Sequence, residues 1–480
     1  MVKNANADQH IADAADKPAE KENKYRVIYD EIVKQLQAGE IKPGGKLPSI
    51  REITVRFGCS KNTVIRAYDD LEKEHLIYSV PKSGYYAMAP AAYDESPEQG
   101  VIDLSSAAPD RSVMPYEEYQ HCLNRAIDLY QDRLFSYSDP QGFLSLRKEL
   151  EKHLASAQVF AKLEQISVVS GAQQALHLLA AMPFPNGKTT VLVEQPTFFG
   201  MLRTLELLQV PAVGITRTEE GLDLDELERH FRNNNIKCFY TMPRFHNPLG
   251  TSLSQGQKKK IARLAAKYDV YIIEDDYLAD LEVSRKADPI FSVDEAARTI
   301  YIKSFSKVML PGLRLAAVVL PLQLVASFRM FKASCDSSTA SLSQGALEIY
   351  LSGGMFDRHV AQMRVLYQER IGMLAELCAK WLPQGMKLSA AEAGIFAQIS
   401  VPHRLPAEEL AAVLRQQRVL VTPMDRCYLR GFASGNGLRL SVIRADRENM
   451  ERGIKQIGET AAALLERKSA VPSGAVIEWV

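Results

Sequence analysis

The 480-residue sequence has no excess of either charge, few cysteines and no long apolar run. Its 58 basic and 58 acidic residues balance, so any affinity for nucleic acid must come from a local patch. The six cysteines are scattered without a close pair, which argues against a zinc site and against a disulfide framework. We therefore expect free thiols in a reducing cytoplasm, and no metal site.

The sequence also shows no pattern that would predict a leader or a membrane span. No basic-then-apolar segment opens it, and the longest apolar stretch, about residues 315–328, is interrupted by Pro321 and Gln323. That stretch is shorter than the roughly 18 residues that a span requires. The sequence predicts a protein with no membrane partner, and its length leaves room for two or three domains.

Composition divides the chain into five segments. Residues 1–22 hold almost no large apolar side chains and are predicted to be a disordered tail. Residues 23–88 have the pattern of a small helical domain, and residues 89–100, rich in alanine, proline and acids, are predicted to be a linker. Residues 101–470 alternate strands with helices, and residues 471–480 are predicted to be a second tail.

The predicted strands of the long segment are apolar throughout, which is typical of strands that are covered on both faces. Amphipathic helices fall between them and predict an α/β domain with a large, mostly parallel sheet. After a long helix near residues 356–382, we expect a smaller C-terminal α/β domain. The predicted strands are ISVVSG, TTVLVEQP, IKCFYTMP, VYIIEDD, TIYIKSFS and LRLAAVVLP.

Residues 47–87 predict a winged helix-turn-helix. Ser49 and Glu52 have the spacing of a capping box, Gly58 permits a tight turn, and Ser60 can cap the next helix. A wing is expected to turn at residues 82–84. The side chains predicted to face the core of this module are Val64, Ala67, Tyr68 and Leu71.

Charge is unevenly distributed in this module. Residues 42–66 contain six basic side chains and one acidic side chain, a net charge of +5. The positive charge falls on the turn and on the first half of the second helix, where a recognition helix meets phosphates and bases. The alternative is a protein-interaction module with a solvated basic face.

The module resembles the GntR family of winged-helix regulators, whose pattern "LP-S-RE-A…S-TV-RAY-LE-E-G" it follows. This resemblance implies operator DNA as a partner. His75 stands where the family usually has glycine, and Ile65 stands where some relatives have arginine, so base specificity does not transfer. The DNA-facing residues that the resemblance implies are Arg51, Ser60, Lys61, Asn62, Thr63 and Arg66, with Lys82 and Gly84 in the wing.

The segment YIKSFSKVMLPGLR, residues 301–314, contains two lysines whose neighbouring residues differ. Lys303 lies within the predicted strand. Ser304 and Lys307 come at its C-terminal end, where ligands bind in open α/β sheets. Arg314 follows a Pro-Gly turn and can fold back towards an anion. An amine beside hydroxyls and a guanidinium is typical of a Schiff-base lysine next to a bound phosphate.

Other strand ends supply complementary groups. Ala172 and Gln173 follow a glycine turn and can offer backbone N–H groups to a phosphate. Phe198 can stack on a flat ring. Asp275 ends a buried strand, where a carboxylate is costly unless it is paired, and a protonated pyridine nitrogen would be its partner. Arg439 is suited to bind a carboxylate with two hydrogen bonds.

In this order the segments resemble fold type I aminotransferases. The resemblance implies that Lys307 binds pyridoxal 5′-phosphate as a lysine aldimine and that Asp275 pairs with the pyridine nitrogen. It implies that Asn247 and Tyr277 bond the ring hydroxyl. The phosphate would be held by Ser304, Arg314, Ala172 and Gln173, and the carboxylate of an amino compound by Arg439.

Tyr137 matches a tyrosine that reaches the phosphate of the neighbouring subunit, which implies a homodimer with shared sites. The sequence NPLG at 247–250 agrees with true aminotransferases. The sequence SSAAPD at 105–110 departs from their usual Gly-x-Pro-Asp. Arg203 is either a second carboxylate contact or a surface residue.

A GntR-like head joined to an aminotransferase-like body resembles the MocR/GabR type of regulator. The resemblance implies a transcriptional regulator that binds pyridoxal 5′-phosphate and responds to a small amino compound, or to pyridoxal 5′-phosphate itself. The alternative is a pyridoxal-phosphate-dependent aminotransferase with an appended DNA-binding domain. A residual transaminase half-reaction is compatible with the regulator. A remnant that binds neither cofactor nor ligand is disfavoured because the cofactor residues are complete.

Overall fold

The structure is a computed structural model whose chain divides into two compact units, Met1–Pro97 and Glu98–Val480. It describes residues 17–88, 100–282, 287–389 and 394–470. Residues 1–16 and 471–480 of the predicted tails, and residues 89–99 of the predicted linker, lie outside the described residues. No helix in the described ranges is both long and apolar enough to cross a membrane.

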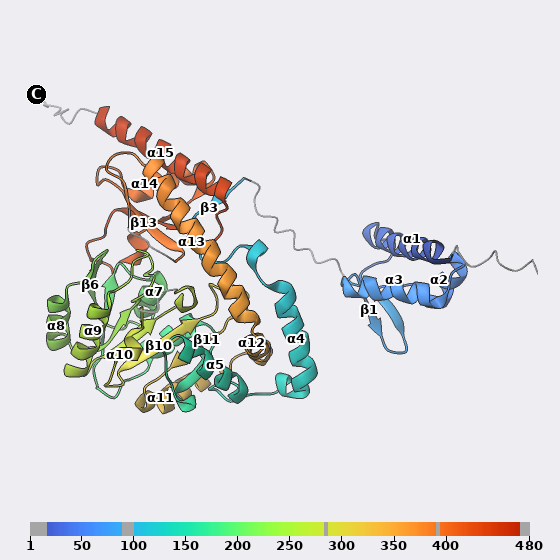
Figure 1. Ribbon diagram of the computed structural model, residues 1–480, viewed down its shortest axis with the longest axis horizontal. Coiled ribbons are helices and arrows are strands. Elements are labelled where there is room, and N and C mark those ends of the chain that lie inside the picture. The colour runs from blue at the N-terminus through green and yellow to red at the C-terminus, as the bar shows by residue number, and fades with distance from the viewer. Residues whose placement is uncertain (1–16, 89–99, 283–286, 390–393, 471–480) are drawn as a thin grey trace, which may run out of the picture. The chain divides into compact units, whose positions relative to one another are not determined.

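The first unit is a helix-turn-helix followed by a two-stranded antiparallel wing (Figure 1). Its core brings Ile28 and Ile32 of the first helix against Val64, Tyr68 and Leu71 of the third. This confirms the predicted core face. The elements are α1 (Lys17–Gln37), α2 (Ile50–Phe57), α3 (Lys61–Lys73), β1 (Ile77–Val80) and β2 (Gly84–Ala87).

The predicted helix ends of this unit are confirmed. Ser49 and Glu52 form a capping box at the start of α2, because each side chain bonds the other's backbone N–H. Gly58 ends α2 in the left-handed conformation at φ 55°, which glycine adopts without a steric cost. Ser60 caps α3 by accepting a hydrogen bond from the backbone N–H of Thr63.

Two boundaries differ from the prediction. Helix α1 begins at Lys17, so residues 17–22 of the predicted tail are helical. Their sequence KPAEKE lacks large apolar side chains, but it combines strong helix formers with a proline in the first turn. The wing turns at residues 81–83, and Gly84 is already the first residue of β2.

The second unit is built on an eight-stranded sheet in the order β4-β11-β10-β9-β8-β5-β6-β7. Strands β10, β9, β8, β5 and β6 run parallel, while β11 is antiparallel to both of its neighbours and β7 is antiparallel to β6. The predicted mostly parallel sheet is therefore confirmed. The strands are β4 (Ile166–Val169), β5 (Thr190–Gln195), β6 (Ala212–Thr218), β7 (Gly221–Leu222), β8 (Ile236–Thr241), β9 (Tyr271–Asp275), β10 (Thr299–Ser304) and β11 (Ala316–Val319).

Both faces of this sheet are covered by helices, which explains the continuous apolar strands. Val191 and Val193 of β5 belong to the largest apolar cluster, on one face. Leu192 between them packs with residues of α8 and α9 on the other face. The helices of this part are α4 (Tyr116–Tyr130), α5 (Leu144–Ser156), α6 (Ala172–Ala181), α7 (Phe199–Leu207), α8 (Leu224–Asn233), α9 (Gln255–Lys267), α10 (Ile290–Val293), α11 (Leu322–Asp336) and α12 (Ser341–Ser352).

A smaller lobe follows the sheet, as predicted, and has its own apolar cluster. Its antiparallel sheet has the order β12-β13-β16-β15, and a separate parallel pair joins β14 to β3. The small lobe therefore includes the first strand of the unit. The elements are β3 (Ile102–Asp103), β12 (Lys387–Leu388), β13 (Phe396–Ser400), α14 (Ala407–Gln416), β14 (Val419–Leu420), β15 (Thr422–Pro423), β16 (Gly437–Ser441) and α15 (Arg447–Ala470).

Helix α13 (Met355–Trp381) joins the two lobes of this unit (Figure 1). Phe356 and Tyr367 in its first part belong to the cluster of the large sheet. Ile371 and Leu374 in its second part belong to the cluster of the small lobe. One helix thus shares the cores of both lobes.

Candidate functional sites

The predicted site residues gather at one edge of the large sheet. Asp275 is the last residue of β9 and Ser304 is the last residue of β10. These strands are parallel, with Ile302 paired to Asp275, so both residues lie at the carboxyl edge. Lys307 follows β10 closely at that edge, where open α/β sheets bind their ligands.

The amine of Lys307 is a reactive group in this environment. Burial, together with the nearby charges of Arg439 and Arg314, lowers the pKa of Lys307 to about 8, and the charge of Asp275 opposes this shift. A substantial fraction of the amine is therefore neutral near neutral pH, as a nucleophile must be. Its Nζ donates a hydrogen bond of 2.8 Å to the carbonyl oxygen of Ala107.

Asp275 is a buried carboxylate with one free oxygen. Its Oδ2 accepts a hydrogen bond of 2.8 Å from the hydroxyl of Tyr240, while Oδ1 is buried without a partner among the described residues. Burial raises the pKa of Asp275 to about 6, and the hydrogen bond from Tyr240 moderates that rise. An unpaired buried acceptor is costly, so this atom is suited to a protonated partner.

The turn before α6 lies against the guanidinium of Arg314. Gly171 precedes α6 at φ 86°, and a Cβ there would lie 2.5 Å from Nη2 of Arg314. Only glycine therefore leaves room for the guanidinium against this turn. The side chain of Gln173 donates to Gly200 and Thr204, so Gln173, like Ala172, can offer only its backbone N–H to an anion.

Two further predicted groups are Ser304, at the end of β10, and Phe198, before α7. Ser304 is buried, and its hydroxyl accepts a hydrogen bond of 3.2 Å from the backbone N–H of Ser306. Phe198 is the residue before α7, and its ring would lie 2.5 Å from a Cβ at Gly200. The lack of a side chain at Gly200 therefore leaves room for the Phe198 ring against the first turn of α7.

Asn247 and Tyr277 lie on neighbouring loops. The hydroxyl of Tyr277 donates a 2.6 Å hydrogen bond to the carbonyl oxygen of Phe245, which ties the loop after β9 to the loop after β8. Asn247 is buried, and its amide makes no hydrogen bond within the described residues. Its donors and acceptor therefore remain available to a ligand.

Arg439 reaches the same site from β16 of the small lobe. Its Nη2 donates to the carbonyl oxygen of Ser105 at 2.6 Å and to the hydroxyl of Thr422 at 3.3 Å. The guanidinium lies 4.7 Å from the ring centre of Phe396, and its Nε is buried without a partner among the described residues. The guanidinium is therefore held in place and still has a hydrogen-bond donor available for a ligand.

Residues 103–108, which we name the strap, contact both Lys307 and Arg439. The carbonyl oxygen of Ala107 accepts from Lys307, and that of Ser105 accepts from Arg439. Asp103 folds the strap by accepting from the backbone N–H of Ser105 and of Ser106, both at 2.9 Å. The segment that departs from the aminotransferase pattern thus lies directly on the site.

Two other predicted residues lie away from these groups. The side chain of Tyr137 is 95% exposed, so it lies at the surface of this chain. Arg203 is also exposed and pairs with Glu206 at 2.9 Å, which supports the surface interpretation of this arginine.

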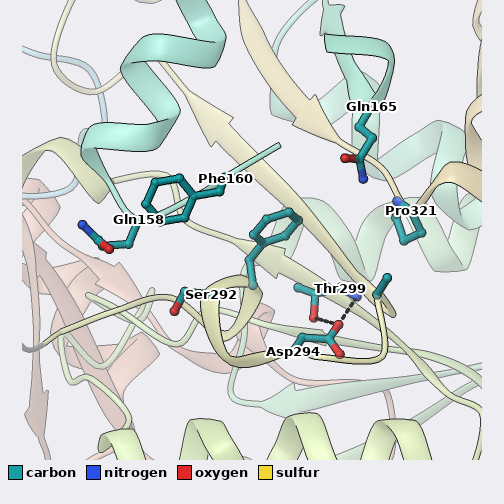
Figure 2. A pocket seen from close by; sticks show the side chains of 9 residues that line it. Gln158, Phe160, Gln165, Ser292, Asp294, Thr299 and Pro321 are labelled. Carbon is teal, nitrogen blue, oxygen red and sulfur yellow. Dashed lines mark hydrogen bonds between the residues drawn. The ribbon is translucent and has the colours of Figure 1, made fainter. Parts of the chain in front are cut away.

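A separate cavity of about 250 Å³ lies near the opposite edge of the sheet (Figure 2). Thr299, which lines it, is the first residue of β10, whereas Ser304 is the last. The carboxylate of Asp294 in this cavity already accepts from the backbone N–H and the hydroxyl of Thr299. This cavity is therefore not part of the site around Lys307.

Some of the predicted DNA-facing side chains of the first unit make contacts within the fold, and others are exposed at the surface. Ser60 and Thr63 bond each other and cap α3, and Arg66 lies 4.8 Å from the ring centre of Tyr25. Lys61 and Asn62 are exposed and make no hydrogen bond or ion pair within the described residues. The exposed side chains Arg51 and Lys82 complete the basic face, while Gly84, at φ 116°, lies in the wing.

Sequence reasoning missed three contributors to the strand-end site. Tyr240 is buried on β8, and its approach to Asp275 depends on the parallel pairing of β8 with β9, in which Tyr240 pairs with Ile273, two residues before Asp275. Glu194 accepts from the backbone N–H of Met242 at 2.9 Å and so fixes the loop that carries Asn247. The backbone carbonyl groups of the strap leave no mark in a residue pattern.

Comparisons with known proteins agree with this arrangement. Residues 100–457 match the family Aminotransferase class I and II, and residues 24–86 match Bacterial regulatory proteins, gntR family. The uncharacterized HTH-type transcriptional regulator YcxD of Bacillus subtilis (strain 168) is 46% identical over 436 residues, or 90% of this chain and 98% of YcxD. The probable rhizopine catabolism regulatory protein MocR of Rhizobium meliloti is 26% identical, over 94% of this chain and 97% of MocR. The chain belongs to the MocR type of GntR regulators.

This MocR-type protein is thus a transcriptional regulator with an aminotransferase-like, pyridoxal-phosphate-binding domain. The kynurenine aminotransferase of Pyrococcus horikoshii, solved in complex with PMP and with KYN and KYA, matches its fold with a TM-score of 0.71. The two chains are 26% identical, and the match covers 76% of this chain and 91% of that one.

The residues present fit the cofactor. The unpaired Oδ1 of Asp275 offers an acceptor for a ring N–H, and the glycine turn at Gly171 leaves an anion site beside Arg314. Lys307 supplies the amine between them. An acceptor, an amine and an anion site together match the pyridine, aldehyde and phosphate of pyridoxal phosphate.

Proposed function

We propose that this MocR-type regulator senses a small molecule bearing a primary amine and a carboxylate, and that binding of this molecule changes its affinity for operator DNA. One observation carries the proposal: the strap touches both Lys307 and Arg439. These are the two groups that the amine and the carboxylate of an amino acid would engage. Because the strap bonds to both groups, binding of an amino acid there and the position of the strap are linked.

Lys307 would bind the cofactor aldehyde, Asp275 would hold the ring nitrogen in its protonated form, and Asn247 and Tyr277 would orient the ring hydroxyl. When bound, pyridoxal phosphate supplies an aldehyde that condenses with amines and a ring that withdraws electrons. Phe198 would cover the ring. The phosphate would be held by Ser304, Arg314 and the backbone N–H groups of Ala172 and Gln173.

Arg439 binds the carboxylate of the effector. A carboxylate forms a stronger, charge-assisted hydrogen bond than a peptide carbonyl does, so it displaces the carbonyl oxygen of Ser105 from this guanidinium. When pyridoxal phosphate is bound, an effector amine would act at the aldehyde that Lys307 would hold, and it would therefore also bear on the contact of Lys307 with Ala107. Both events act on the strap.

The strap connects the site to the rest of the chain. Asp103, its first residue, belongs to β3, and the residues before β3 in the sequence lead towards the GntR head. A typical coupling of about 1–3 kcal/mol between two ligands changes affinity by about 5- to 150-fold, which is enough for a transcriptional switch. By linkage, operator DNA changes the affinity for the effector by the same factor.

The regulator acts as a homodimer with shared sites. Support comes from Tyr137 and from other exposed apolar side chains nearby in the sequence, namely Phe135, Leu129 and Leu144. Exposed apolar groups in such numbers are typical of an interface. In the dimer, Tyr137 contacts the phosphate in the partner subunit.

Transamination is the second candidate function. The complete set of strand-end groups and the sequence NPLG at 247–250 favour it. An enzyme turns over repeatedly when it is given an amino donor and a keto acid, whereas a sensor carries out at most one half-reaction.

The full-length protein loaded with pyridoxal phosphate tests the proposal. It is titrated with a panel of amino acids and with the matched amines that lack the carboxylate, while the cofactor absorbance is followed. Affinity for a duplex selected from a randomised library is measured in parallel. We expect one or more amino acids to change both quantities and the matched amines to change neither.

The matched variant Arg439→Gln should lose the response to the effector carboxylate and keep the cofactor absorbance. A change of absorbance with no change of DNA affinity in the wild-type protein contradicts the sensor. Sustained turnover with a keto acid establishes the aminotransferase instead.

A further inference from the structure

Helix α3 has few side chains that can read bases. Of the residues in its first two turns, Val64 and Ala67 are buried in the core of the unit. Thr63 shares a hydrogen bond of 2.9 Å with Ser60, which caps the helix. Arg66 stacks on Tyr25 of α1. These contacts commit most of the helix to the fold.

The uncommitted side chains at the start of α3 are Lys61, Asn62 and Ile65. Asn62 is exposed and makes no hydrogen bond within the described residues. Ile65 is 36% exposed, although it is a large aliphatic residue in the middle of a basic face. Asn62 and Ile65 are three positions apart and therefore lie on the same side of the helix.

Charge limits which part of α3 can enter a DNA groove. Lys61 and Arg66 lie in the first half of the helix, and the acids Asp69 and Asp70 begin the second half. Phosphates attract the first half and repel the second. The N-terminal turns, where Asn62 and Ile65 lie, are the part that meets the base edges.

The chemistry of these two side chains selects one class of base pair. The amide of asparagine matches the N6 donor and N7 acceptor of adenine, and an apolar side chain matches the 5-methyl group of thymine. The helix rises about 4.5 Å over three residues, which is close to the spacing of about 3.4 Å between base pairs. Neither side chain forms the bidentate donor pair that reads guanine.

We infer that α3 recognises adjacent A·T pairs in the major groove of the operator, with Asn62 bonded to an adenine and Ile65 against a thymine methyl group. This inference rests on the proposed binding of operator DNA and names the sequence class that is bound. Lys61 contacts phosphate and adds affinity without choosing the base.

The test begins with selection of duplexes from a randomised library by the full-length protein loaded with pyridoxal phosphate. Each thymine of the selected site is then replaced by deoxyuridine, which removes only the 5-methyl group. At one thymine we expect about a fourfold loss of affinity for the wild-type protein, the value of one buried methyl group. Ile65→Ala should bind thymine and deoxyuridine equally.

Asn62→Ala should lower affinity by about 5- to 150-fold and relax the preference for adenine at one position. Val27→Ala removes the same kind of exposed aliphatic side chain from α1, outside this face, and should keep the discrimination against deoxyuridine. Because Asn62, Ile65 and Val27 are all exposed, these variants are expected to keep the fold, which circular dichroism checks.

The outcomes separate two failures. If the wild-type protein selects no duplex, the proposed DNA binding is wrong and the inference falls with it. If it selects a site in which no thymine methyl group matters, or if Ile65→Ala still discriminates against deoxyuridine, DNA binding stands and the inference is overturned.

Discussion

The charged residues of the GntR head and those of the strand-end site are held in opposite ways. Lys61 and Arg51 are exposed, and Lys61 has no partner among the described residues. Lys307 is largely enclosed, Asp275 and Arg439 are buried, and each has a pKa shifted by that burial. The head therefore keeps its functional charges solvated, and the body holds them at an energetic cost that a ligand can relieve.

The largest effect is expected when the amine of Lys307 is removed. Lys307→Ala should abolish the imine that borohydride reduces, because the amine of the neighbouring Lys303 is buried and paired with Asp280 at 2.5 Å. Mass spectrometry after reduction measures this. Binding of the head to a selected duplex should persist, and a variant that still carries reducible cofactor would show that another lysine is used.

Asp275→Asn should weaken cofactor binding but stabilise the cofactor-free protein. Loss of a charge-assisted hydrogen bond lowers cofactor affinity by about 10- to 150-fold. The pKa of Asp275 is raised to about 6, so ionising it costs stability as the pH rises through the window from its ordinary value of about 3.9 to 6. Above pH 6 the amide removes that cost, and the melting temperature of the cofactor-free protein should rise. A lower melting temperature there would contradict the buried-charge account.

The pH dependence of cofactor loading tests whether burial shifts the pKa of Lys307, which is enclosed, whereas Lys61 of the head is exposed. The pKa of Lys307 is about 8, and only the neutral amine attacks the aldehyde. The rate at which cofactor-free protein gains absorbance should therefore increase about tenfold per pH unit below 8 and level off above it. Stopped-flow mixing with pyridoxal phosphate measures the rate, and a flat profile between pH 6 and 9 would refute this pKa.

Lys61→Ala tests the exposed charge of the head. Loss of one phosphate contact should lower the slope of log affinity against log salt by about 0.9, which is about a fivefold loss of affinity at 0.15 M salt. Lys73→Ala removes a lysine from the other end of the same helix and should leave the slope unchanged. Fluorescence anisotropy across a salt series compares the two variants.

The smallest effect concerns a helix end. His75 follows α3 at φ 55°, in the left-handed region that glycine adopts most easily. His75→Gly should stabilise the head by up to about 1 kcal/mol, or a rise in melting temperature of about 4–8 °C. His75→Ala keeps the strained backbone and should give no such gain, as differential scanning fluorimetry of the two variants would show.

Local rules explain most of what the sequence predicted. The caps at Ser49, Gly58 and Ser60 depend only on neighbouring residues, so each was predictable. The gathering of Asp275 and Lys307 followed from strand ends that meet at one sheet edge. These features need no knowledge of distant contacts.

What escaped prediction depends on contacts between distant segments or on the backbone alone. The contact of Ala107 with Lys307 joins residues 200 positions apart through a carbonyl group that every residue possesses. The start of α1 at Lys17 was missed because the absence of apolar side chains outweighed helix propensity in the prediction. Tyr240 was missed because its partner lies on another strand.

The chain enters its second unit through β3. The short pairing of β3 with β14 decides which lobe this entrance is attached to. Ile102 and Asp103 pair with Val419 and Leu420, so this entrance is part of the small lobe and not of the eight-stranded sheet. The backbone at this entrance is therefore held to the lobe that carries Arg439. Because Ile102 and Leu104 also belong to the apolar cluster of that lobe, packing as well as backbone pairing holds the first strand of the second unit to it.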